Sequence, residues 1–217
     1  MFNRDNYINS PIEIERELLL LLQKENVKNV FDIGACEAED SIRYSLLFPN
    51  STVYAFEPRK DNLAIGQKSI LKYNRPNIVL ENIALSKENG TAEFFLSEGR
   101  PADATEEHQW DFGNKSSSLL PPTEEMKKHT SWLQFNNKIE VETMRLDNYV
   151  VNKNISEIDF VHIDVQGAEL MVLEGAGDFL KKIKLIWMEV EAVELYKNQP
   201  LKNDVEHLES NNYDGLD

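Results

Sequence analysis

Short apolar runs alternate with amphipathic stretches along most of the chain. Such runs bounded by Gly or Pro are typical of buried strands, whereas apolar residues at helical spacing indicate helices that pack by one face. We assign strands to residues 30–34, 53–58, 78–85, 158–164 and 183–190, and helices to 42–48, 61–73 and 168–173. Strands that alternate with helices form βαβ units, so the pattern predicts an α/β fold with a mostly parallel sheet in a three-layer αβα arrangement.

The N-terminal segment, residues 1–28, is expected to contribute one helix. Ser10 is the predicted N-cap, Pro11 occupies the first helical position, and Glu13 completes a Ser-x-x-Glu capping box. The apolar positions that follow fall on one helix face and are Ile14, Leu18, Leu21 and Leu22. We therefore expect this helix to pack against the rest of the protein.

A long segment over residues 97–138 interrupts the pattern. It follows a strand predicted at 91–96 after an Asn-Gly turn, it has no strand signals of its own, and it allows a short helix over 123–135. A connection of this length is either a lid or substrate-binding insertion or a disordered segment. Trp110 and Trp132 supply apolar anchors that a disordered segment would lack, so we favour the insertion.

The composition is that of one ordinary globular domain. The 217 residues are 41% hydrophobic and 28% charged, and 23 basic against 38 acidic residues give a net charge of −15. This charge argues against binding to nucleic acid or to a membrane surface, both of which need a cationic face. The single cysteine excludes an internal disulfide framework, and no apolar run is long enough to span a bilayer. We expect residues 1–217 to form a single cytoplasmic domain.

Residues with binding character lie where the predicted strands end. In open α/β sheets, ligands bind at the carboxyl ends of the strands. Gly34 ends the first strand, where it allows a tight turn and leaves room for a ligand beside the chain. Glu57 ends the second strand 23 residues later and can accept hydrogen bonds from both hydroxyls of a ribose. The dinucleotide pattern G-x-G-x-x-G is absent, so these residues predict a nucleoside site without a pyrophosphate cradle.

Five motifs in chain order together resemble one known family. They are Asp32-Ile33-Gly34-Ala35, Phe56-Glu57-Pro58, residues 82–86, Leu146-Asp147 and residues 163–169. Each is weak alone, but the ordered set extends from about residue 29 to residue 200 and resembles the FkbM-type family of S-adenosylmethionine-dependent methyltransferases. The most specific part is Asp-Val-Gln-Gly-Ala-Glu at 164–169. The resemblance implies a Rossmann-like class I methyltransferase fold, S-adenosylmethionine as the methyl donor, and a hydroxyl of a sugar or small metabolite as the acceptor.

The resemblance also implies a cofactor site. The residues that would border the methionine half of the cofactor are Asp32, Gly34 and Ala35. Glu57 would hold the ribose, and Asn82 with Ile83 would flank the adenine. The full predicted cofactor set is Asp32, Gly34, Ala35, Cys36, Glu57, Pro58, Asn82, Ile83 and Ala84.

Three positions depart from the residues usual in that family. Cys36 stands in place of Asn, Ala38 in place of a second Gly, and His162 in place of Lys. The last change is the most consequential, because it replaces a fixed cation with a titratable group. We predict no metal site, since the remaining histidines lack partners at ligand spacing; they are His108, His129 and His207.

Polar side chains alternate with apolar ones around the end of the strand predicted at 158–164. His162, Asp164 and Gln166 share one face, and three polar groups in a row are costly unless they are paired or face a ligand. A hydroxyl acceptor must lose a proton, so Asp164, nearer the mouth, is our preferred catalytic base. His162 is either a second candidate base or a hydrogen-bonded supporting residue. Gln166 and Glu189 are the predicted substrate-binding residues.

Two other functions remain open on this reasoning. The departures at positions 38 and 162 suit a catalytically silent member of the family that serves as a binding or assembly module. An NAD-dependent enzyme is disfavoured, because no second and third glycine accompany Gly34. Neither the identity of the acceptor nor the oligomeric state follows from the sequence.

The C-terminal part is short for a class I methyltransferase sheet. A helix is predicted over 203–210, and residues 211–217 suffice for one short strand at most. The sheet of the family has two more strands at this point. We therefore expect either a sheet that is cut short at this edge or an edge that a partner chain covers.

Overall fold

The computed structural model describes residues 3–102, 104 and 112–202, and its central feature is a parallel sheet. In this part of the chain the sheet has five strands, in the spatial order β3 (Ile78–Glu81), β2 (Thr52–Phe56), β1 (Asn29–Ile33), β7 (Phe160–Ile163) and β8 (Ile186–Met188). All neighbouring strands in it run parallel. The order reverses between β1 and β7, which places a ligand-binding crevice at the carboxyl ends of these strands.

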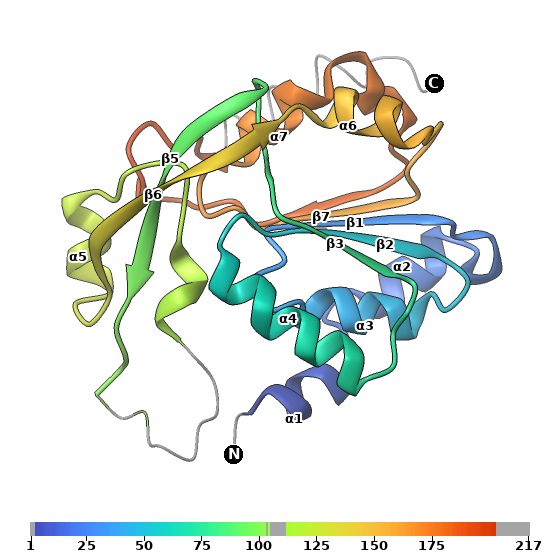
Figure 1. Cartoon of the computed structure of the whole chain (residues 1–217), viewed down its shortest axis with the longest axis horizontal. Helices are drawn as coiled ribbons and strands as arrows, with labels where there is room; N and C mark the ends of the chain where they lie inside the picture. Colours follow the sequence, from blue (N-terminus) through green and yellow to red (C-terminus); the bar gives the residue numbers. More distant parts are fainter. Residues whose placement is uncertain (1–2, 103, 105–111, 203–217) are drawn as a thin grey trace.

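Helices cover both faces of this sheet (Figure 1). The helices α3 (Glu39–Leu47) and α4 (Lys60–Lys72) lie on one face, and α6 (Leu146–Lys153) and α7 (Glu169–Ala176) lie on the other. Within β1, Val30 belongs to the core under α3, whereas Phe31 and Ile33 belong to the core under α6 and α7. Burial of alternate residues on opposite faces is what a central parallel strand requires, so the predicted three-layer α/β arrangement is confirmed.

A second, smaller sheet stands beside the carboxyl ends of the first. Its order is β4 (Ala84–Leu85), β6 (Gln134–Met144) and β5 (Gly90–Glu98), with β5 and β6 antiparallel. The predicted strand at 78–85 is therefore wrong as a single element. It breaks at Asn82, whose side chain donates hydrogen bonds to the carbonyl oxygens of Glu57 and Pro58 at 3.0 and 2.9 Å. The chain then passes from the first sheet into the second.

The sequence does not predict strand β6, which begins inside the insertion and continues past its end at residue 138. Most of its residues are exposed or half-buried, and Val141 and Thr143 alone are buried in it. A strand without a continuous apolar face gives no alternation to detect. The helix predicted at 123–135 is the shorter α5 (Glu124–His129).

The N-terminal segment contains two helices instead of one. Asn3 caps α1 (Arg4–Asn9), and its side-chain oxygen accepts a hydrogen bond from the Asn6 amide at 2.8 Å. The predicted capping role of Ser10 is wrong, because its hydroxyl donates back to the Asn6 carbonyl at 2.7 Å. The next helix, α2 (Glu15–Leu21), begins five positions later without a side-chain cap. Leu18 and Leu22 are buried as expected, whereas Leu21 is 64% exposed.

The insertion is anchored by a small apolar core. Trp132 packs there with Met126, Leu133 and Tyr196, and the last of these comes from the segment after β8. Trp110, the other predicted anchor, lies outside the described residues, as do the helix predicted at 203–210 and the segment 211–217. In the part of the chain that the structure describes, β3 and β8 are the two edge strands of the parallel sheet, and no helix is both long and apolar enough to span a bilayer.

Candidate active site

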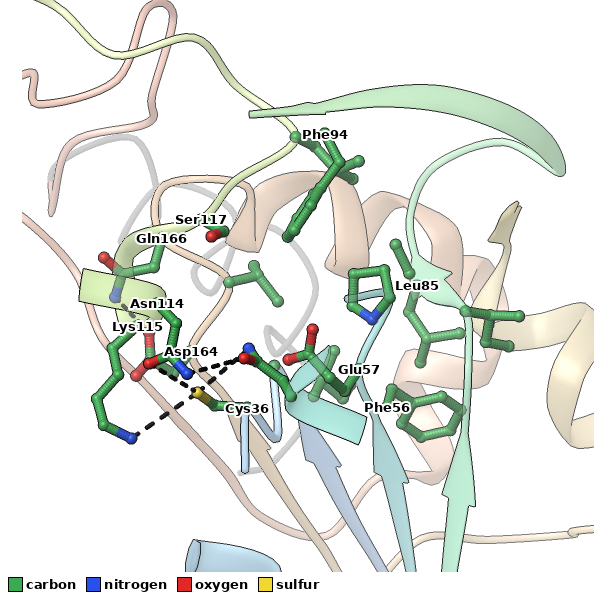
Figure 2. Close-up of a pocket in the computed structure, with 18 residues that line it drawn as sticks. Cys36, Phe56, Glu57, Leu85, Phe94, Asn114, Lys115, Ser117, Asp164 and Gln166 are labelled. Atoms are coloured by element: carbon green, nitrogen blue, oxygen red, sulfur yellow. Dashed lines mark hydrogen bonds between the residues drawn. The ribbon is translucent and has the colours of Figure 1, made fainter. Parts of the chain in front are cut away.

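A cleft opens at the carboxyl ends of β1, β2 and β7 (Figure 2). The second sheet and the 3₁₀ helix η2 (Gly113–Ser116) of the insertion form its outer wall. Its lining residues are Ile33, Gly34, Cys36, Phe56, Glu57, Pro58, Asn62, Ile83, Ala84, Leu85, Phe94, Asn114, Lys115, Ser117, Leu119, Asp164, Val165 and Gln166. The cleft therefore combines strand ends of the parallel sheet with side chains from the insertion.

The turn after β1 is shaped by a close approach of two loops. Gly34 has φ of +92°, and a Cβ atom at this position would lie 1.8 Å from the carbonyl oxygen of Asp164. Glycine is thus required for the predicted tight turn, because the loop after β7 fills the space that a Cβ atom would need. Cys36 and Ala38 follow in the left-handed region, at φ of 48° and 63°.

Glu57 is buried at the end of β2 and faces the cleft. Its Oε1 accepts a hydrogen bond from the Arg59 amide at 2.6 Å, and the residue is only 4% exposed. Burial raises the pKa of Glu57 to about 7, and the hydrogen bonds to its carboxylate oppose that rise. A carboxylate that faces a cleft at this strand end can accept hydrogen bonds from a pair of vicinal hydroxyls.

Asp32 and His162 form a buried pair beneath the cleft. They are direct neighbours in the register of β1 and β7, and His162 Nδ1 lies 3.0 Å from Asp32 Oδ1. The hydroxyl of Ser41, on α3, donates to the other oxygen of Asp32. Burial opposes a charge on His162, but the hydrogen bond and the charge of Asp32 outweigh it and raise the pKa of His162 to about 9. At neutral pH position 162 therefore still holds a cation.

Asp164 and Gln166 line the cleft at the end of β7. Gln166 Nε2 donates to Asp164 Oδ1 at 2.7 Å and also to Glu189 Oε2 at 3.3 Å. Burial raises the pKa of Asp164, and the hydrogen bond from Gln166 opposes this rise. Glu189 itself is exposed and does not line the cleft.

Three polar residues of the insertion belong to the cleft: Asn114, Lys115 and Ser117. Asn114 Nδ2 donates to Glu37 Oε1 and to Asn62 Oδ1, both at 2.8 Å. In the sequence, Asn114 and residues 116–118 look like ordinary loop polar residues, and that interpretation is wrong for Asn114 and Ser117. The one signal that could have found them was their position in the segment predicted to cover the site.

The predicted site residues divide into two groups. Those that line the cleft are Gly34, Cys36, Glu57, Pro58, Ile83, Ala84, Asp164 and Gln166, and those that do not are Asp32, Ala35, Asn82, His162 and Glu189. The second group supports the first. Ala35, for instance, is buried in the core and donates its amide to the Phe56 carbonyl at 2.9 Å. Among the described residues no three His, Cys, Asp or Glu side chains are grouped to hold a metal, and His108 and His207 lie outside this part.

Comparison with known proteins identifies relatives over most of the chain. The model of the methyltransferase FkbM domain family matches residues 32–214. The 2-O-methyltransferase NoeI of Sinorhizobium fredii (strain NBRC 101917 / NGR234) is 31% identical over 202 residues, which are 93% of this chain and 79% of that protein. Methyltransferase 1 of Beauveria bassiana (strain ARSEF 2860) is 20% identical over 132 residues, 60% of this chain and 51% of that protein.

A similar solved structure is an rRNA methylase from Streptococcus thermophilus. It aligns over 97% of this chain and 82% of its own, with 14% identity and a TM-score of 0.46.

The match to the FkbM family model begins at Asp32, the first residue of the first predicted motif, and continues through all the other motifs. The chain therefore belongs to the FkbM methyltransferase family.

Proposed function

We propose that this methyltransferase uses S-adenosylmethionine to methylate a hydroxyl of a sugar or of another small hydroxylated molecule. The observation that carries the proposal is the order of side chains along the cleft. Phe56 and Leu85 lie at an apolar end, Glu57 lies next to them, and the charged end holds Asp164 and Lys115 (Figure 2). An adenosyl amino acid has the same order of parts: a flat base, a ribose diol and a charged amino-acid end.

The side chains of the cleft fit this cofactor. Glu57 would accept hydrogen bonds from the ribose hydroxyls, and the apolar side chain of Ile83 would flank the base. The positive charge of the cofactor suits a cleft in which Glu57 and Asp164 are the acidic groups. When bound, S-adenosylmethionine supplies a methyl group activated by its attachment to a sulfonium.

Asp164 is the proposed proton acceptor for the hydroxyl of the methyl acceptor. It lines the cleft, and a carboxyl whose pKa is raised by burial is a stronger base than an ordinary aspartate. His162 is the weaker candidate, because its pKa of about 9 leaves it protonated at neutral pH and it already hydrogen-bonds Asp32. Its proposed role is to support the end of β7 and to hold the cation that a Lys usually supplies.

The proposed class of methyl acceptor rests on the relative NoeI and on the net charge of this chain. NoeI is named as a 2-O-methyltransferase, and this chain aligns with most of it. A net charge of −15 disfavours a nucleic-acid acceptor. Gln166, which lines the cleft beside Asp164, is the proposed contact for acceptor hydroxyls, and Glu189 would act on them through Gln166.

Isothermal titration with S-adenosylhomocysteine and with NAD⁺ tests the cofactor. We expect the wild type to bind the first and not the second. Glu57→Gln should weaken binding of S-adenosylhomocysteine at least about tenfold, since a charge-assisted hydrogen bond is lost. Glu140→Gln, an exposed change on β6, is the matched control.

Because burial raises the pKa of Glu57, its ionised form destabilises the folded state above about pH 7. Above that pH, the Glu57→Gln variant should therefore be at least as stable as the wild type.

Turnover separates an enzyme from a silent binding module. With S-adenosylmethionine and a pool of hydroxylated acceptors, release of S-adenosylhomocysteine is expected. Binding without any release would leave the protein as a silent member of the family, and failure to bind S-adenosylhomocysteine would overturn the proposal altogether.

A further inference from the structure

Lys115 is the cation of the cleft lining, and it lies at the end opposite the apolar side chains (Figure 2). In that view Lys115 and Asp164 lie together on one side, whereas Phe56 and Leu85 lie on the other. The charged end thus presents one positive and one negative side chain. This pair of charges is complementary to a zwitterion.

The backbone on both sides of Lys115 is held in place. Before it, Asn114 donates to Glu37 and Asn62. After it, the Ser116 carbonyl accepts a hydrogen bond from the Tyr196 hydroxyl at 2.7 Å. Lys115 is therefore presented to the cleft by a fixed segment of the insertion, and little ordering is needed when a ligand binds.

The immediate surroundings of Lys115 favour its charged form. Its Nζ lies 3.5 Å from Glu39 Oε1 and 3.8 Å from Cys36 Sγ. Burial raises the pKa of the Cys36 thiol well above its ordinary value, so this neighbour is neutral. The ammonium side chain is 28% exposed and can reach an anion that enters the cleft.

We propose that Lys115 binds the carboxylate of the amino-acid part of the cofactor. The proposal rests on the proposed use of S-adenosylmethionine and extends it. The insertion, which the sequence associates with the acceptor, then also completes the cofactor site. A purely structural alternative is that Lys115 only ties the insertion to Glu39.

Two ligands that differ in the amino-acid part distinguish these roles. S-adenosylhomocysteine has the carboxylate, and 5′-methylthioadenosine keeps the nucleoside and the thioether but lacks it. Titration of Lys115→Met should show at least about a tenfold loss of affinity for S-adenosylhomocysteine, with affinity for 5′-methylthioadenosine within about twofold of wild type. Lys115→Arg should retain most of the affinity. Lys127→Met, on the exposed face of α5, is the matched control.

Each other outcome is decisive. If Lys115→Met binds both ligands as the wild type does, Lys115 does not contact the carboxylate. If it loses both ligands equally, its role is structural, and the proposal is overturned in either case. If the wild type binds 5′-methylthioadenosine as tightly as S-adenosylhomocysteine, no subsite for the amino-acid part exists, although the nucleoside site stands. If the wild type binds neither ligand, the proposed cofactor is wrong and this inference is overturned with it.

Discussion

Residues with positive φ mark the cleft at the scale of single residues. In the described part of the chain, six residues other than glycine adopt such angles, and three of them are asparagines, which tolerate this conformation well. The other three are Cys36, Ala38 and Gln166, all in the loops that follow β1 and β7. A left-handed conformation costs a residue with a Cβ atom about 1–2 kcal/mol. The strain is therefore concentrated in the two loops that form the site, which is where functional sites commonly store it.

His162 makes the stability of the protein depend on pH. Its pKa rises from an ordinary value of 6.5 to about 9 in the folded state, because Asp32 outweighs the effect of burial. The folded state thus holds the proton more tightly, and the resulting stabilisation of about 3 kcal/mol is complete below about pH 6.5 and disappears as the pH rises through about 9. Urea unfolding should show wild type more stable than His162→Gln by up to this amount near pH 6, and a much smaller difference near pH 10.

The comparison needs an exposed histidine, and His129 pairs at the surface with Glu125 instead of with a buried aspartate. His129→Gln, at the exposed end of α5, removes a histidine without touching Asp32. Parallel stability curves for wild type and His162→Gln across this pH range would show that the Asp32 pair does not stabilise the charged imidazole. His162→Lys, which restores the residue usual in the family, should hold its charge beyond pH 9 and so extend the stable range upward.

At the scale of elements, strands buried on both faces were predictable from the sequence, and exposed ones were not. β1, β2 and β7 have apolar residues on both sides, and the sequence predicts them together with the loops that carry Gly34 and Glu57. β6 has no continuous apolar face, and its pairing with β5 joins residues that are far apart in the chain. Asn114 and Lys115 were missed for the same reason, since their roles depend on contacts with distant residues that no local pattern encodes.

The pairing of Asp32 with His162 was predictable only in part. The sequence identifies His162 as a polar residue in an apolar strand and Asp32 as part of the first motif. The register that joins β1 to β7 does not follow from the sequence. Asp32 lies beneath the cleft and is not one of the residues that line it. Once the strand order is known, these two residues form one buried pair, which explains the polar side chain at position 162.

Gly175 fixes how closely α7 approaches the second sheet. A Cβ atom at this position would lie 2.2 Å from the Ser86 carbonyl oxygen, which follows β4. Replacing a helix glycine with alanine normally stabilises a helix by about 1 kcal/mol. Here Gly175→Ala should instead destabilise the protein by about 1–3 kcal/mol, because the helix or β4 must shift. Thermal unfolding measures the sign directly, and an increase in melting temperature would contradict the close packing of α7 on this backbone.

At the scale of the molecule, three distant parts of the chain meet at the cleft. Arg4 of α1 pairs with Glu37, and the same carboxylate accepts a hydrogen bond from Asn114 of the insertion. Tyr196, beyond β8, hydrogen-bonds both Ser116 and Gln166. The outer wall of the cleft therefore depends on the start of the chain, the insertion and the segment after the last described strand together. A parallel sheet alone would position Glu57 and Asp164 but would leave the cleft open on this side.

The net charge of −15 gives the whole molecule a field that favours a cationic ligand. S-adenosylmethionine carries one net positive charge at neutral pH and S-adenosylhomocysteine carries none, so the two ligands separate this effect from all shared contacts. Salt screens charges over about 10 Å at 0.1 M and over about 3 Å at 1 M. Raising the salt concentration from about 50 mM to about 500 mM should therefore weaken binding of S-adenosylmethionine several-fold. The fold-change in affinity for S-adenosylhomocysteine should be less than half as large. Titration of both ligands at the two salt concentrations measures the ratio of their affinities. An unchanged ratio would show that the acidic surface contributes to solubility and not to attraction of the cofactor.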